Sequence, residues 1–156
     1  MQPVLIILVF STAVFAQSKI EIQNAANRAI LILQRSASEF VAKRACISCH
    51  HNILPVLTFR LAQERGFVVD SAVLRAVEEK TFRGILGPEA LDEAIQAATL
   101  NDPTPNDSYL LMAAHAARIE PDLVTSVYVR RLLGWQRDGH WVTSDFRPPT
   151  SDLATS

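Results

Sequence analysis

The sequence predicts an all-α domain of antiparallel helical hairpins, and three observations support this class. Apolar residues recur every three or four positions through most of the chain after residue 17. Prolines and glycines divide these periodic segments into lengths typical of helices. No alternation of apolar and polar residues continues long enough to predict a strand. With 49% hydrophobic and 20% charged residues among 156, the chain can bury a core of its own. We therefore expect about six helices, joined by connections short enough for hairpins.

The first helix is predicted over residues 20–43, where Gln, Asn, Arg and Lys separate the apolar positions. Ser36 and Ser38 predict a break that divides this helix into two segments. Pro55 suits the first turn of a second helix, because the N–H that proline lacks needs no intrahelical partner there. Gly66 is expected to end that helix.

The third helix is predicted to begin at Asp70 and Ser71, whose short polar side chains can cap it. Gly84 and the Gly-Pro pair at 87–88 are expected to interrupt it. A short helix then follows over residues 88–100.

The second half of the chain predicts two further helices. Residues 101–107, Asn-Asp-Pro-Thr-Pro-Asn-Asp, predict a turn-rich linker whose last residues cap the next helix. Residues 109–118 are strongly apolar, which indicates a buried inner helix. Residues 121–122, Pro-Asp, begin the last helix, which ends near Trp135. Residues 147–150, Arg-Pro-Pro-Thr, predict an extended or irregular segment.

The N-terminus has the features of a signal peptide. Residues 4–15 form an apolar run that is too short to span a bilayer, and residues 14–16, Val-Phe-Ala, resemble a cleavage site before Gln17. No Lys or Arg precedes the run, and a short buried or membrane-associated helix is the alternative. We expect residues 1–16 to be a signal peptide and residues 17–156 a single domain without a stable membrane span. Its location is then periplasmic or extracellular, where the surroundings are oxidising.

Charge and motif content exclude several functional classes. The chain has 15 basic and 16 acidic residues, so we expect no nucleic-acid partner. It lacks G-x-S-x-G, a glycine-rich phosphate loop and H-E-x-x-H. Its aspartates are scattered through predicted turns, where Asp usually shapes the backbone. We therefore predict no catalytic residue.

One short stretch holds both cysteines and two of the four histidines, Cys46-Ile47-Ser48-Cys49-His50-His51. The spacing C-x-x-C-H is typical of c-type haem attachment, in which Cys46 and Cys49 bond the haem vinyl groups and His50 ligates the iron. It predicts haem c as cofactor and haem binding with electron transfer as function, with an unidentified redox partner. His51 lies too close to His50 to reach the opposite haem face, so we expect a supporting or surface role for it.

Three other interpretations of the cluster remain open. A disulfide between Cys46 and Cys49 would close a very small loop, stabilise little and be redox-labile. A thioredoxin-like pair requires a βαβ setting, which the sequence does not predict. Zinc could take both cysteines and a histidine, but a fourth ligand at zinc-finger spacing is missing.

Met112 and His115 are the candidates for a second axial ligand. Met112 is the only methionine beyond the predicted signal peptide, and His115 follows it by about one helical turn, so both can face the same direction. Each has an alternative role within an apolar helix. Met112 would fill the core, and His115 would be a buried histidine with a hydrogen-bond partner.

Residues 128–141 carry a resemblance to a known family, with the sequence Tyr-Val-Arg-Arg-Leu-Leu-Gly-Trp-Gln-Arg-Asp-Gly-His-Trp. Gln136 can bond the backbone exposed at a helix end, while Trp141 covers the turn at Gly139. This stretch resembles the QW repeat of the squalene-cyclase/prenyltransferase superfamily, whose members fold as α/α toroids. Residues 46–70, 106–112, 136–141 and 146–149 resemble blocks of exported bacterial squalene-cyclase-like proteins that carry a C-x-x-C-H-H element.

The resemblance implies a partial α/α toroid. It does not imply cyclase or prenyltransferase activity, because the Asp-x-Asp-Asp acid motif of the cyclases has no counterpart here. A complete toroid needs roughly twice as many helices, so we expect the N-terminal portion of a longer protein or a truncated product. Such a portion would have an open helical edge, with apolar surface that favours self-association.

Overall fold

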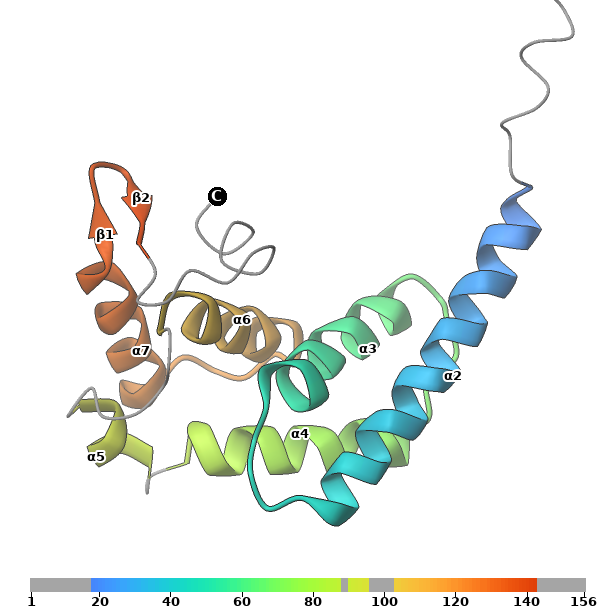
Figure 1. Ribbon diagram of the computed structural model, residues 1–156, viewed down its shortest axis with the longest axis horizontal. Helices are drawn as coiled ribbons and strands as arrows, with labels where there is room; N and C mark the ends of the chain where they lie inside the picture. The colour runs from blue at the N-terminus through green and yellow to red at the C-terminus, as the bar shows by residue number, and fades with distance from the viewer. Residues whose placement is uncertain (1–17, 88–89, 96–102, 143–156) are drawn as a thin grey trace, which may run out of the picture.

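The chain folds into helices that pack around one apolar core, which confirms the predicted all-α class (Figure 1). The computed structural model describes residues 18–87, 90–95 and 103–142. None of the helices within these ranges is long and apolar enough to cross a membrane. The predicted signal peptide, the end of the helix predicted over 88–100 and the segment at 147–150 lie outside the described residues.

The elements follow in chain order. The helices are α2 (Lys19–Lys43), α3 (Leu54–Glu64), α4 (Ser71–Ile85), α5 (Ala90–Ile95), α6 (Pro103–Ala116) and α7 (Leu123–Gly134). A π-helical turn, η1 (Cys49–Ile53), leads directly into α3. The strands β1 (Gln136–Arg137) and β2 (His140–Trp141) form a small antiparallel hairpin after α7.

Side-chain caps determine where three of the helices begin. Ser18 and Glu21 form a reciprocal capping box at the start of α2. Asp70 accepts hydrogen bonds from two backbone amides of the first turn of α4, as predicted. Asp122 accepts from the backbone N–H of Thr125 at 2.8 Å and caps α7. At each of these ends a short polar side chain satisfies an amide that has no intrahelical partner.

Of two predicted interruptions, the one within the first helix is wrong. α2 continues through Ser36 and Ser38, because a serine in a helix costs only a fraction of a kcal/mol relative to alanine and Ala37 between them is buried. The other is confirmed, because α4 ends at Ile85, between Gly84 and Gly87. A Cβ atom at Gly84, if one were present, would come within 2.5 Å of the Cδ1 atom of Ile47, so close packing also favours a glycine there.

The predicted linker at 101–107 is also wrong over the part that the structure describes. α6 begins at Pro103, since a first-turn proline lacks only an N–H that has no partner there. Thr104 is fully buried, and its hydroxyl donates to the backbone oxygen of Val142 at 2.5 Å. Asp107 is fully buried as well. These polar residues, which predicted a surface turn, make long-range contacts instead.

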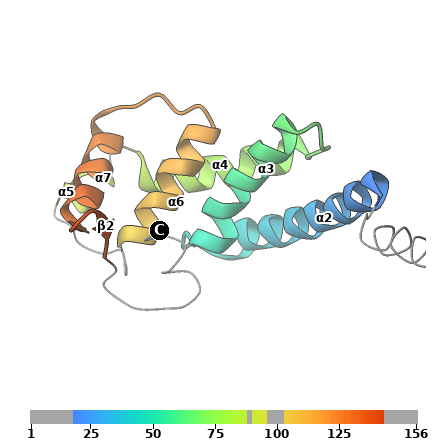
Figure 2. The ribbon, with the colours of Figure 1, turned by 90° about the horizontal axis from the view of Figure 1, so that it is seen from above.

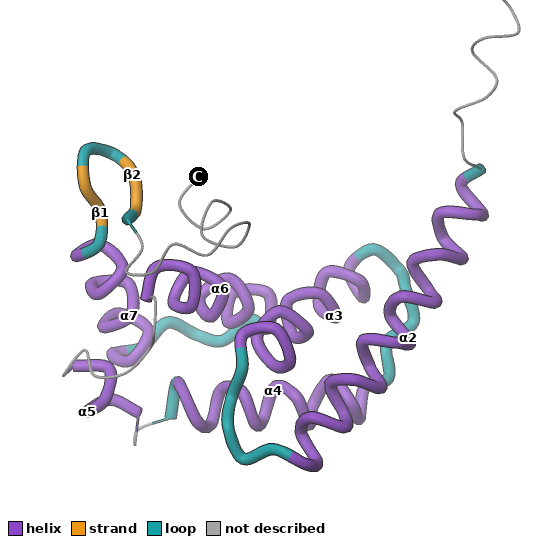
Figure 3. The backbone as a smooth tube through the Cα atoms, viewed as in Figure 1, coloured by secondary structure: helices purple, strands orange, loops and turns teal. Residues whose placement is uncertain are grey.

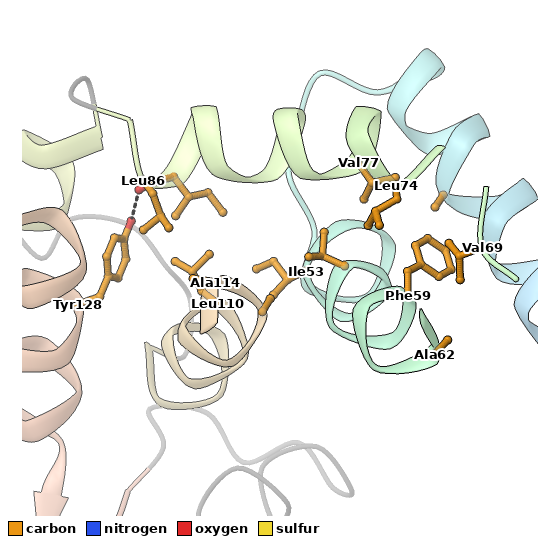
Figure 4. Close-up of a cluster of buried hydrophobic side chains, with 14 of the residues drawn as sticks. Ile53, Phe59, Ala62, Val69, Leu74, Val77, Leu86, Leu110, Ala114 and Tyr128 are labelled. Carbon is orange, nitrogen blue, oxygen red and sulfur yellow. Dashed lines mark hydrogen bonds between the residues drawn. The ribbon is translucent and has the colours of Figure 1, made fainter. Parts of the chain in front are cut away.

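The core is one continuous cluster beneath α4. Figure 4 shows it extending from Tyr128 and Leu86 at one end to Phe59 and Val69 at the other. The Tyr128 hydroxyl donates to the backbone oxygen of Ile85 at 3.0 Å and so ties α7 to the end of α4. The two halves of the described chain therefore share a single core.

The most extensive helix contacts join α2 with α4, α3 with α6, and α6 with α7. Only the last of these pairs consists of neighbours in the chain. The N-terminal end of α2 extends away from the other helices in two perpendicular views (Figures 1 and 2). Ile20 and Ile22 in that end are 68% and 54% exposed, respectively.

A buried ion pair joins α6 to α7. The Arg131 guanidinium donates to both carboxylate oxygens of Asp107, at 2.7 and 2.5 Å, and also lies over the Tyr128 ring. Burial raises the pKa of Asp107, while the hydrogen bonds from Arg131 oppose that rise. The hydrogen bonds to Asp107 raise the pKa of Arg131. Two short contacts between a guanidinium and one carboxylate are the geometry of a charged pair, so we take both groups as ionised.

We expect Asp107→Asn to lower the free energy of unfolding by about 3–5 kcal/mol, because it leaves the Arg131 guanidinium buried without a counter-charge. Urea unfolding measures the loss. Glu79→Gln is the matched control, since the Glu79–Arg83 pair is exposed and should contribute at most about 1 kcal/mol. Equal losses in the two variants would show that the buried pair has no special role.

Candidate functional site

The Cys/His cluster lies where the loop after α2 turns into η1. Because the cluster lies between the first predicted helix and the one that starts near Pro55, we expected all of it to form an irregular link. Residues 44–48 are irregular, but Cys49, His50 and His51 belong to η1, so this prediction is wrong for the second half of the cluster. The backbone N–H of Leu54 donates to the oxygen of Cys49, which is the wide turn of a π-helix. Such turns are frequent at functional sites.

Asn52 closes this turn from inside the protein. Its Oδ1 atom accepts from the backbone N–H of Ser48 at 3.0 Å, and its own backbone N–H donates to the Ser48 oxygen at 2.9 Å. Asn52 is fully buried, and its Nδ2 atom has no hydrogen-bond partner in the described part of the chain. We call this pair of hydrogen bonds the Ser48–Asn52 clasp. It holds Cys49, His50 and His51 in one tight loop.

The clasp presents a thiol and an imidazole side by side. The Sγ atom of Cys49 lies 3.3 Å from the Nδ1 atom of His50. Cys46 and His50 are exposed, Cys49 is half-buried, and the two cysteines are not joined by a disulfide in this structure. The Cys49 thiol is next to an imidazole, and a second thiol lies three residues earlier. Both thiols can react with another molecule without any rearrangement of the buried core.

The His51 ring packs between α2 and the His50 ring. It stacks on Phe40 of α2, with centroids 4.6 Å apart and planes 7° apart, and tilts against His50 at 4.8 Å. The ammonium group of Lys80 from α4 lies 5.6 Å from the centre of the same Phe40 ring. His51 is half-buried, and its Nδ1 atom has no hydrogen-bond partner among the described residues. Of the two roles expected for it, this placement fits the supporting one.

A hollow of about 450 Å³ lies between the Cys46–Cys49 loop and α4. It is lined by side chains from the end of α2, the loop and one face of α4: Val41, Ala45, Ile47, Ala76, Glu79, Lys80, Arg83 and Gly84. Lys80 donates to the backbone oxygens of Val41, at 3.2 Å, and of Arg44. We call this space the α4 hollow. Ile47, which lies between the two cysteines in the sequence, is one of its lining residues.

Met112 and His115 lie together, as their helical spacing predicted, but not at the cluster. Both line a different hollow of about 490 Å³ with Leu57 and Leu61 of α3. Leu57 follows His50 by seven residues, which is about 10 Å along a helix axis. Met112 is 53% exposed and His115 is also exposed, so the alternative roles as core filler and buried histidine are wrong.

The candidate QW-type residues form the small hairpin after α7. Gln136 pairs with Trp141 across the strands, and Asp138 and Gly139 form the turn with φ of 50° and 83°. A turn with two residues of positive φ matches the twist of a hairpin. Arg137 donates to the backbone oxygens of Gly134 and Gln136 at 2.8 and 2.7 Å. Arg137 therefore donates the hydrogen bond to the backbone at the helix end that we expected from Gln136. The Gln136 side chain itself is exposed.

Three residues of the site were not predicted from the sequence, namely Asn52, Phe40 and Gly84. The sequence could have indicated the role of Asn52, because an Asn shortly before a helix that begins with proline often forms hydrogen bonds with nearby backbone. It could not have indicated the roles of Phe40 and Gly84, because the residues that they contact lie on other elements of the fold. Within the described ranges, no group of three or more His, Cys, Asp or Glu residues is arranged to hold a metal ion.

Comparison with known proteins returns no match to a family model, to a curated protein or to a solved structure. The resemblance to squalene-cyclase-like proteins thus stays a prediction from residues 128–141 and the short blocks described above.

We expect Asn52→Ala to loosen the turn, because it removes the side-chain half of the Ser48–Asn52 clasp from a buried position. Hydrogen exchange of the amides in residues 49–53 should accelerate, with a loss of about 1–3 kcal/mol in the free energy of unfolding. Asn27→Ala, an identical change on the exposed face of α2, is the control and should leave both quantities unchanged. Unaltered exchange in Asn52→Ala would contradict the role of the clasp.

Proposed function

We propose that this chain binds haem c covalently through Cys46, Cys49 and His50 and takes part in electron transfer. One observation carries the proposal: Cys49 and His50 lie on a turn that the Ser48–Asn52 clasp holds from inside, and the exposed Cys46 precedes that turn by two residues. In the attachment each S–H adds across a vinyl C=C, so a C–S bond forms and the hydrogen passes to the neighbouring carbon. A bound haem iron supplies one-electron chemistry by alternating between its ferrous and ferric states.

The donor set fits this cofactor. The Nδ1 atom of His50 already lies 3.3 Å from the Cys49 sulfur, which leaves Nε2 as the nitrogen for the iron. A hydrogen bond at one ring nitrogen orients the imidazole and sets its tautomer. The sulfur remains a weak acceptor after it becomes a thioether. His50 can therefore keep its orientation when Cys49 is bonded.

The proposal assigns one protein ligand to the iron from the described residues, namely His50. Met112 and His115 line the hollow beside Leu57 and Leu61, and no residue of the cluster lines it. A haem bound in this way would take no second protein ligand from the described residues, and an added ligand would then have access to the iron.

The setting of the site is part of the same proposal. Export through residues 1–16 would bring the thiols to an oxidising compartment where covalent haem attachment takes place. Packing of α2 on α4 and of α3 on α6 supports two helical layers, as in part of an α/α toroid. Leu123 and Leu133 on α7 are 66% and 56% exposed, which supports association through that edge.

A second candidate is a helical-repeat protein with a redox-labile Cys46–Cys49 disulfide and no haem. The contact between the Cys49 sulfur and His50 favours it, because an imidazole can accept the thiol proton during disulfide exchange. Both candidates use the same turn, and they differ in the mass of the mature chain.

Expression of the full chain with haem-maturation machinery tests the proposal. Intact mass should show cleavage before Gln17 and the gain of one haem, and the band should stain for covalent haem. His50→Ala and the Cys46→Ser/Cys49→Ser pair should lose the haem. Ser48→Ala should keep it, because Ser48 makes the clasp through its backbone atoms only. A mass two hydrogens below the dithiol form supports the second candidate, and the bare dithiol mass contradicts both.

The ferrous haem protein is expected to bind carbon monoxide, since Met112 and His115 line a different hollow from the one beside the cluster. A shift of the Soret band on addition of the gas measures this. A low-spin spectrum that carbon monoxide does not change would contradict the open position. In that case, Met112→Ala and His115→Ala identify which of the two side chains has moved to the iron.

A further inference from the structure

We propose that α2 is an interaction surface for a second copy of this chain, and that the two α2 helices pair antiparallel. The contact surface is an exposed apolar stripe in the first half of the helix, formed by Ile22, Ala25, Ala29 and Ile32. We call it the α2 stripe. The inference does not rest on the haem proposal, because no residue of the Cys/His cluster belongs to the stripe.

The first half of α2 projects beyond the helical core. The buried residues of this helix are Ile30, Gln34 and Ala37, so burial begins only near the middle of its 25 residues. Figures 1 and 2 show the N-terminal end of α2 extending away from the other helices, and Figure 3 shows α2 as one uninterrupted helix. Because helices in proteins are stabilised mainly by packing of an apolar face, this end has surface available for another molecule.

The α2 stripe is separate from the buried face of the helix. Its four residues follow one another at intervals of three, four and three positions, which is the spacing of a coiled-coil seam. All four are exposed, and Ile22 and Ile32 are 54% and 66% exposed, respectively. At 3.6 residues per turn, the stripe lies roughly 120° around the helix from the buried residues. Contiguous exposed apolar surface of this kind marks an interaction site.

The stripe is complementary to itself. Its order of residues, Ile-Ala-Ala-Ile with intervals of three, four and three, is the same in both directions along the helix. In an antiparallel pair with its two-fold axis level with Asn27, Ile22 meets Ile32 of the second copy. Ala25 meets Ala29 in the same way, and each contact occurs twice, as in any isologous interface. The central alanines allow the two helix axes to approach closely.

Charged residues beside the stripe favour the antiparallel direction. Glu21 and Arg35 lie on one flank of the stripe, two heptads apart. In the antiparallel pair, Glu21 lies within about 3 Å, measured along the helix axis, of the level of Arg35 in the second copy. This attraction occurs twice. Arg28 lies between them on the same flank, and its two copies oppose the pairing once, near the axis. The antiparallel direction also places the two helical cores at opposite ends of the pair.

The length of the stripe indicates a reversible dimer. Residues 22–32 span only about 15 Å of helix. The interface is therefore at the small end of specific complexes, which bury about 1,200–2,000 Å² in total. We expect monomer and dimer to interconvert with concentration.

Sedimentation velocity of the full chain over a range of concentrations tests the inference, with a reductant present so that no intermolecular disulfide forms. The unaltered chain should change from monomer to dimer as its concentration rises. Ala29→Glu should raise the dissociation constant at least about tenfold, because it places a carboxylate of each copy within the seam. Arg28→Gln should lower it about twofold, because it removes the repulsion near the axis.

Leu31→Glu is the matched control, since Leu31 is 54% exposed on the same helix but lies on the side away from the stripe. It should leave the dissociation constant unchanged. Leu133→Glu tests the exposed edge of α7 in the same way and should also have no effect. Circular dichroism at low concentration should show equal helix content in all variants, because each altered side chain is exposed.

Cysteine cross-linking tests the direction of the pair. In chains that also carry Cys46→Ser and Cys49→Ser, an equal mixture of the Ala25→Cys and Ala29→Cys chains should form a disulfide-linked dimer under mild oxidation. Either chain alone should cross-link more slowly, because its two thiols would then be about 6 Å apart along the helix axis. Faster cross-linking of either chain alone indicates a parallel pair and overturns the inference.

Three further outcomes overturn the inference. The first is a chain that stays monomeric at every concentration, and binding of that monomer to phosphatidylcholine vesicles would assign the stripe to a membrane surface. The second is an unchanged dissociation constant in Ala29→Glu. The third is loss of the dimer in Leu133→Glu but not in Ala29→Glu, which would place the contact on α7. A chain that fails to gain haem leaves all of these results intact.

Discussion

Ser48 and Asn52 exchange two hydrogen bonds at the point where α2, α3, α4 and α6 all contact η1. The inner residues of this turn are committed to the core, since Asn52 is fully buried and Ile53 is 4% exposed. The outer residues, Cys49 and His50, are consequently held at the surface by a segment that cannot move without disturbing four helices. A buried polar side chain is stable only while its hydrogen bonds persist, so the clasp constrains both the fold and the candidate site.

The rest of the molecule is connected to this turn through one core. Tyr128 links α7 to the end of α4, and the Asp107–Arg131 pair links α7 to α6. α4 in turn carries Gly84, against which Ile47 rests, and Lys80, which holds the end of α2. The loop that bears Cys46 is therefore positioned by α4. The site depends on long-range packing even though its reactive residues are adjacent in the chain.

The arrangement of the cluster separates its chemistry into two faces. Cys46, Cys49 and His50 face outward, where thiol addition or disulfide exchange can occur. His51 faces inward on Phe40, where it supports the turn. Below the loop, the α4 hollow places cations next to aliphatic surface. Haem attachment would use both thiols and the His50 imidazole, whereas a disulfide would use only the thiols, which is why we rank the haem function first.

Local patterns in the sequence determined the features that depend on near neighbours. The all-α class, the caps at Asp70 and Asp122, and the contact of Cys49 with His50 follow from residues at most four positions apart. Tertiary structure decided the rest, because the partners are distant in the chain. The sequence predicted a turn at Asp107, which instead pairs with Arg131, and it did not indicate that Ile47 packs beside Gly84. In the same way, the packing of α6 on α3 places Met112 and His115 beside the hollow that Leu57 and Leu61 line. A local sequence pattern could not indicate this position, because it depends on contacts between two helices that are distant in the chain.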